Sequence, residues 1–112
     1  MATEALSEAE KLRLVPGIYF GTEPAGRYAK VTGTGIDVWQ IIDAYTSMDR
    51  SLPRLRYTFH WLSEAQLQAA LRYYSLFPDE IDEKLAREAE ITPEWIAAHF
   101  PLKPGQPHPR RT

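Results

Sequence analysis

The sequence contains no cysteine among its 112 residues, which excludes a disulfide framework and thiolate ligands for a metal. It also has no apolar run approaching the roughly 18 residues of a membrane span. Its first residues, MATEALSEAEKLRL, carry glutamates where a secretory signal would carry positive charge and then an apolar run. We therefore expect one compact domain in the cytoplasm, without membrane association.

Motifs for catalysis and metal binding are missing as well. The histidines at 60, 99 and 108 are far apart and form no HExxH-type pattern. Ser63 lacks the GxSxG context of a nucleophile. The acidic run at 79–83 falls in the first turn of an expected helix, where the helix dipole favours it, and no base or nucleophile accompanies it. We expect neither an enzyme nor a bound cofactor or metal.

Charge is distributed unevenly, although the net charge is only −2. Residues 1–49 hold four basic and seven acidic side chains, whereas residues 50–77 hold four basic and one acidic. Residues 78–100 hold two basic and seven acidic side chains, and residues 101–112 hold three basic ones. The pattern predicts a basic surface in the middle of the chain and an acidic one after it.

The N-terminal third predicts a β-hairpin. Residues 1–13 are expected to form a flexible arm or a short helix, and the hairpin to occupy 14–34. Its strands are LVPGIYF at 14–20 and RYAKVT at 27–32, joined by GTEPAG. Since an isolated hairpin is marginal in water, we expect a helix or a second hairpin to cover it.

A helical bundle is expected over 36–100. Asp37 suits the N-cap of a helix at 37–47, and Ser51 suits the cap of a second helix that ends near His60. Ser63 and Gln66 form a capping-box pair that opens a third helix. The expected buried positions are Val38, Ile41, Ile42, Tyr45, Leu52, Leu55, Phe59, Leu67, Ala70, Leu71 and Tyr74.

Prolines divide the rest of the chain. Phe77-Pro78 ends the third helix and begins a fourth, over 78–90, whose apolar face is Ile81, Leu85 and Ala89. A fifth, short helix runs from Thr92 to Phe100, and the proline-rich tail at 101–112 is expected to be disordered.

The stretch PAGRYAKVTGTGIDVWQII, residues 24–42, packs glycines before an apolar helix. It matches neither the Walker spacing nor a dinucleotide-binding fingerprint. We interpret it as a strand-to-helix turn in which glycines supply positive φ angles. Contact between an anion and the amides at the helix start remains the alternative.

Several of these pieces together resemble the bacterial family called domain of unknown function 433, over about residues 15–85. They are Pro24-Ala25-Gly26, Gly33-Thr34, Ile36-Asp37-Val38-Trp39, Ala69-Ala70-Leu71-Arg72-Tyr73-Tyr74 and Pro78-Asp79-Glu80-Ile81-Asp82. The resemblance implies a mainly α, homeodomain-like helix-turn-helix fold. It also implies a Vap-type antitoxin that binds its own operator DNA and blocks a PIN-like ribonuclease toxin.

The chain departs from the family pattern at one position. The family has Gly-Thr-Arg where this chain has Gly33-Thr34-Gly35. Any role of that arginine is therefore missing here or has moved to Arg27 or Lys30.

Candidate DNA-binding residues lie in the basic segment. Phosphates would be held by Arg50, Arg54, Arg56 and Arg72, and base edges read by Gln66, Gln68 and Arg72. A solvated basic face is the alternative. Of the aromatic residues Phe59, Trp61, Tyr73, Tyr74 and Phe77, only Tyr73 and part of Trp61 are expected to be exposed for base stacking. A homodimer, formed through the hairpin, is expected if DNA is the target.

The acidic segment 78–100 is the candidate surface for a basic ribonuclease toxin. Its expected contact residues are Asp79, Glu80, Trp95 and Phe100. Two other functions stay open: a protein-interaction adaptor without DNA binding, and a small-ligand binding protein with a pocket lined by Tyr19, Tyr28 and Trp39.

Overall fold

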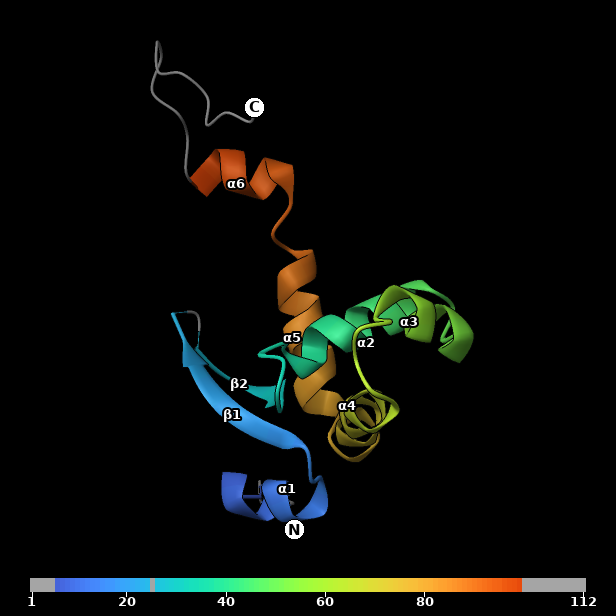
Figure 1. Ribbon diagram of the computed structural model, residues 1–112. Helices are drawn as coiled ribbons and strands as arrows, with labels where there is room; N and C mark the ends of the chain where they lie inside the picture. Colours follow the sequence, from blue (N-terminus) through green and yellow to red (C-terminus); the bar gives the residue numbers. More distant parts are fainter. Residues whose placement is uncertain (1–5, 25, 100–112) are drawn as a thin grey trace.

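The computed structural model describes residues 6–24 and 26–99. This part is mainly helical, with a two-stranded antiparallel hairpin near its N-terminal end (Figure 1). No helix in it is long and apolar enough to cross a membrane. The elements are α1 (Glu8–Leu14), β1 (Ile18–Glu23), β2 (Gly26–Val31), α2 (Val38–Ser47), α3 (Leu52–Thr58), α4 (Glu64–Leu76), α5 (Pro78–Ala89) and α6 (Pro93–His99).

The hairpin is shifted from its predicted place. Its register runs from Ile18 opposite Val31 to Glu23 opposite Gly26. The predicted loop at 21–26 is therefore wrong, because residues 21–23 continue the first strand. The predicted strand at 14–20 is wrong at its start, because the chain turns after α1 at Pro16 and at Gly17, whose φ is +97°.

The core lies where the hairpin and α4 meet α2. Helix α2 contacts β2, α3, α4 and α5, and Figure 1 shows it crossing the middle of the molecule. One face of the hairpin is buried there, which supplies the cover that a two-stranded sheet needs. The buried apolar residues are Val15, Ile18, Ala29, Val31, Val38, Ile41, Ile42, Leu55, Leu62, Leu67, Ala69, Ala70, Tyr73 and Ile81.

The predicted helix starts are confirmed by their caps. Ser51 Oγ accepts from the Arg54 amide at 3.3 Å. Ser63 Oγ accepts from the Gln66 amide at 3.1 Å, and Gln66 Oε1 accepts from the Ser63 amide at 2.8 Å. The same reciprocal arrangement at Ser7 opens α1, so the short helix proposed for the N-terminal arm is present.

One aromatic prediction is wrong. Tyr73 was expected to be exposed, but it is fully buried, because the hairpin packs against α4 on that side. Its ring meets Phe20 of β1 edge-on at 6.2 Å and Phe77 at 4.9 Å between centroids. Trp61, by contrast, is 59% exposed, as predicted.

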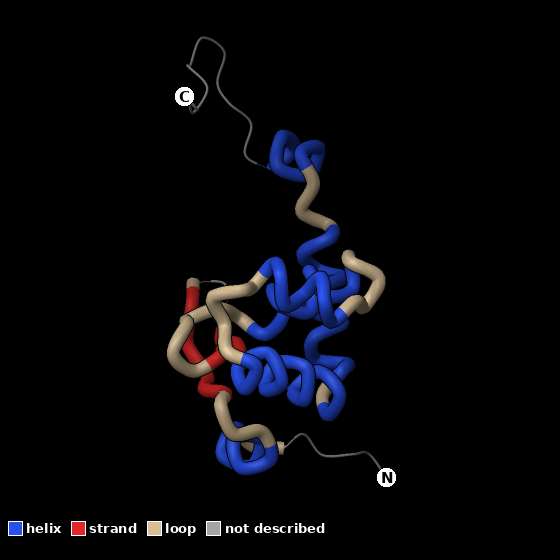
Figure 2. Tube along the Cα trace, turned by 45° about the vertical axis from the view of Figure 1, so that its right-hand side comes forward, coloured by secondary structure: helices blue, strands red, loops and turns tan. Residues whose placement is uncertain are grey.

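The two terminal helices lie at opposite ends of the described chain, with α1 next to the hairpin and α6 beyond the end of α5 (Figures 1 and 2). Neither has a buried residue. Phe100, expected to end the last helix, and the tail at 101–112 lie outside the described residues.

The turn from β2 to α2 can be tested at its glycines. Gly33 has φ +89°, and an added Cβ would lie 3.2 Å from Gln66 Nε2, whereas Gly35 has φ +75° and more space. We expect Gly33→Ala to lower the free energy of unfolding by about 1–2 kcal/mol and Gly35→Ala by about 1 kcal/mol. Urea denaturation measures the free energy of unfolding of both variants. An unchanged midpoint for Gly33→Ala would contradict the positive φ angle at Gly33.

Candidate functional site

The glycine-rich turn ends in a buried ion pair. Thr34 Oγ1 donates to the Val31 carbonyl and accepts from the Ile36 amide, both at 3.0 Å. The Asp37 carboxylate, nearly fully buried, accepts from Lys30 Nζ at 2.5 Å and from Trp39 Nε1 at 2.9 Å. This geometry fits the structural interpretation of the stretch.

Lys30 and Arg27, the residues considered as replacements for the missing arginine, are both paired. Lys30 binds Asp37 and also Glu23, and these two carboxylates hold the pKa of Lys30 above its usual range. Arg27 binds Glu8 through two hydrogen bonds of 2.7 and 3.0 Å. In this conformation both cations join parts of the chain together.

Among the described residues, three of the four candidate arginines, Arg50, Arg54 and Arg72, have no carboxylate partner, whereas Arg56 has one. Within residues 6–24 and 26–99, Arg54 makes no side-chain hydrogen bond or ion pair, and its exposed side chain lines a shallow hollow with Tyr57. Arg50 lies over the rings of Tyr45 and Tyr74, at 5.9 and 5.8 Å from their centroids. Both arginines belong to the start of α3 and the turn before it.

Arg56 and Gln68 converge on one acidic residue. Arg56 donates to the two carboxylate oxygens of Glu64 at 2.8 and 3.0 Å, and Gln68 Nε2 donates to Glu64 at 3.0 Å. These hydrogen bonds, Arg56 first, lower the pKa of Glu64 to about 2. The three side chains form an exposed cluster that bridges α3 and α4.

Gln66 and Arg72 connect α4 to the N-terminal part of the chain. Gln66 Nε2 donates to the Thr32 carbonyl at 3.2 Å, in addition to its capping role. Arg72 Nε donates to the Leu14 carbonyl at 2.9 Å, at the end of α1. The structure thus places Gln66 and Arg72 in contacts that stabilise the fold.

The residues expected to bind a partner protein are dispersed. Asp79 is exposed in the first turn of α5. The Glu80 carboxylate accepts hydrogen bonds from Lys11 Nζ at 2.6 Å and from Tyr73 Oη at 2.7 Å. The pKa of Tyr73 is raised, chiefly because the side chain is buried and secondly because of its hydrogen bond to Glu80. Trp95 stacks on His99 in α6, at 3.9 Å between centroids.

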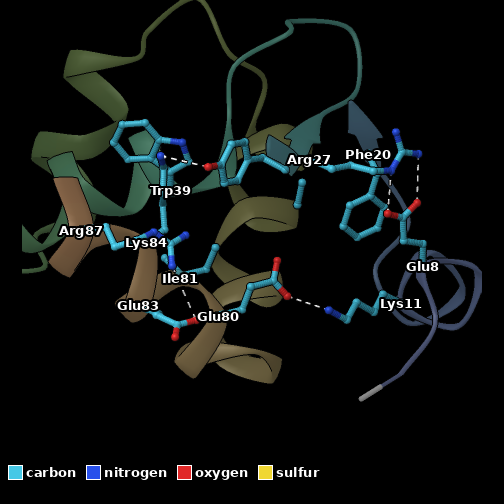
Figure 3. Close-up of a pocket in the computed structure, with 12 residues that line it drawn as sticks. Glu8, Lys11, Phe20, Arg27, Trp39, Glu80, Ile81, Glu83, Lys84 and Arg87 are labelled. Carbon is cyan, nitrogen blue, oxygen red and sulfur yellow. Dashed lines mark hydrogen bonds and ion pairs between the residues drawn. The ribbon is translucent and has the colours of Figure 1, made fainter. Parts of the chain in front are cut away.

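A cavity of about 260 Å³ lies between α1, the hairpin, α2 and α5 (Figure 3). Tyr28 and Trp39 line it as expected, whereas Tyr19 does not. Lys84, which the sequence alone did not indicate, is buried on its wall, and its ammonium lies 4.5 and 5.0 Å from the centroids of those two rings. The i, i+4 spacing to Glu88 was the available signal for an ordered lysine.

The hydrogen-bond partners of Lys84 explain how its charged ammonium can be buried beside the cavity. Its ammonium donates to Glu88 at 2.6 Å and to Tyr28 Oη at 3.2 Å. Burial would lower its pKa, but these two partners outweigh burial and raise it.

No group of three histidine, aspartate or glutamate side chains within the described ranges could hold a metal ion. No family model, curated protein or solved structure matches the chain.

The cluster around Glu64 makes a prediction for pH titration. Because the pKa of Glu64 lies below its ordinary value of 4.5, its stabilising effect is complete above that pH and is lost as the pH falls toward 2. We expect Arg56→Ala to raise this pKa toward 4.5, measured by NMR titration of the side-chain carboxyl. Arg54→Ala, which removes an arginine without contact to Glu64, serves as the control. An unchanged titration in Arg56→Ala would show that the pair is absent in solution.

Proposed function

We propose that the protein is a non-catalytic, antitoxin-like module that binds its own operator DNA and a PIN-like ribonuclease toxin. The helix-turn-helix would consist of α3, the connection at 59–63 and α4. The observation that supports DNA binding is the basic segment 50–77, with four arginines and one acidic residue, whose Arg54 has no side-chain partner among the described residues. DNA phosphates are the polyanion that such a surface would hold.

The shape of this segment suits an exposed contact element. Helix α3 buries a single residue, Leu55, and Figure 1 shows it on the far side of α2 from the hairpin. Helix α4 is linked to it by the Arg56–Glu64 ion pair and exposes Gln68 and Arg72. A nucleic acid could reach both helices without displacing the hairpin.

The internal partners of Arg56 and Arg72 do not remove them from this surface. An exposed ion pair such as Arg56 with Glu64 adds little to stability, so a phosphate can replace the carboxylate. Arg72 uses only Nε toward Leu14, which leaves its terminal nitrogens available. Arg50 and Arg54 would make the first phosphate contacts, and the other two would follow.

A homodimer would place two such surfaces on one operator. The outer edge of β2 is partly covered, since Lys30 forms a bridge with Asp37. Among the described residues the outer edge of β1 pairs with no strand. We therefore assign the proposed dimer contact to β1.

The toxin would bind α5 and α6. Residues 78–100 carry seven acidic and two basic side chains, and α6 exposes Ile96 next to Trp95. A positively charged ribonuclease groove complements that combination of acidic and apolar groups.

An adaptor without DNA binding is the second candidate. It is favoured by the internal hydrogen bonds of Gln66 and Gln68, which occupy groups needed to read bases. It is also favoured by Tyr57 and Trp61, which are 83% and 59% exposed around α3. Exposed aromatic side chains are enriched in protein interfaces.

DNA binding is tested with the purified protein and its own promoter fragment at several salt concentrations. We expect specific binding that weakens as the salt concentration rises. Arg54→Ala should weaken binding and should lower the slope of log affinity against log salt concentration by about 1, the value expected for one lost phosphate contact. Arg87→Ala, which removes an exposed arginine from α5, should leave binding unchanged. Absence of binding even at low salt would exclude the operator role and leave the adaptor.

Toxin binding is tested by copurification with a PIN-like ribonuclease encoded beside the gene. Deleting all of 78–112 would also remove Ile81 from the core, so a point substitution is the sharper test. We expect Trp95→Ala to weaken the complex about tenfold or more, whereas Glu94→Ala should have a small effect. A complex of unchanged affinity in Trp95→Ala would rule out this contact.

A further inference from the structure

Helix α1 is attached to the rest of the protein chiefly by polar contacts. None of its residues is buried, and Leu12 and Leu14 remain exposed. Three hydrogen-bonded contacts fix it, to three different elements. They are Glu8 with Arg27 of β2, Lys11 with Glu80 of α5, and the Leu14 carbonyl with Arg72 of α4.

The attachment has a defined end. Val15, the residue after α1, is fully buried in the core. Two residues later, the Gly17 carbonyl accepts from the Thr32 amide at 2.9 Å, which ties the chain to the end of β2. Any movement of α1 must therefore pivot between Leu14 and Val15.

Helix α1 also forms one wall of the cavity. Glu8 and Lys11 line it on one side, together with Phe20 of β1, and Ile81 of α5 lines it on the other (Figure 3). The Lys11 ammonium lies 5.0 Å from the centroid of the Phe77 ring, which it partly covers. Removing α1 would open the cavity and expose these apolar groups.

We propose that α1 is a lid that opens about the Leu14–Val15 pivot while the hairpin and α2–α5 stay folded. Ionic strength sets the position of this equilibrium. Two of its three hydrogen-bonded contacts are ion pairs near the surface, and salt weakens such pairs, since the Debye length is about 8 Å at physiological ionic strength and shorter at higher salt.

Opening would unfold the lid itself. A helix of seven residues is too short to be stable alone in water. Once its contacts are lost, the amides of Lys11 and Val15 lose their hydrogen bonds to Ser7 and Lys11. Opening also frees Arg27 and Arg72, although the lid does not depend on DNA binding.

Hydrogen exchange of the full chain tests the lid directly. Exchange in α1 is compared with exchange in α2 and α4 at about 20 mM and about 500 mM NaCl. We expect α1 to be protected at low salt and to exchange faster at high salt, while α2 and α4 keep their protection. Because Glu80→Gln still accepts from Tyr73 but loses the charge that binds Lys11, it should speed exchange in α1 about threefold to fivefold at low salt.

Glu83→Gln is the matched control. It removes a carboxylate from the same cavity wall and the same helix. The Glu83 carboxylate pairs with Arg87 of α5 and not with a residue of α1. We expect it to leave exchange in α1 unchanged. Three results would overturn the lid: α1 exchanging only together with α2 and α4, α1 unprotected at low salt, or equal exchange in Glu80→Gln and Glu83→Gln.

Discussion

The arrangement of the molecule depends on the corner between β2 and α2. Over the few residues between Val31 and Asp37, the chain must leave a strand and enter a helix while both flanking residues are buried. Two positive φ angles allow the change of direction, and Lys30 neutralises the buried Asp37. The corner holds one face of the hairpin against α2, so the two-stranded sheet becomes part of the core.

Side-chain charges serve different purposes on the two sides of α2. On the hairpin side, cations are paired and join elements that are distant in sequence, as Lys11 joins α1 to Glu80. On the α3 side, Arg56 pairs with Glu64, but Arg50 lies on aromatic rings and Arg54 makes no side-chain hydrogen bond or ion pair within the described chain. Arg54 has no partner among the described residues to be displaced, so we expect a polyanion to approach first from the α3 side.

The helices could be predicted from sequence because their signals are local. Ser51, Ser63 and Gln66 mark helix starts through hydrogen bonds within four residues. The errors concern contacts between distant elements. Tyr73 looked exposed by helical spacing, but it is buried, and its ring packs against Phe20 of β1 and Phe77. Glu80 likewise pairs with Lys11 of α1, and buried Lys84 contacts Tyr28 of the hairpin. The helical spacing within α5 gives no information about either contact.

The same distinction bears on the candidate DNA surface. The sequence places four arginines in one segment, but it cannot tell which of them the fold uses. The structure ties Arg56 to Glu64, so Arg56 would exchange an internal contact for a phosphate, and it ties Arg72 to α1 through Nε, which leaves only the terminal nitrogens of Arg72 for a phosphate. Such an exchange gains less free energy than a contact made by a free side chain, because the lost partner must be solvated again. Arg50 and Arg54 should therefore dominate any affinity for DNA, while Arg72 couples that surface to the position of α1.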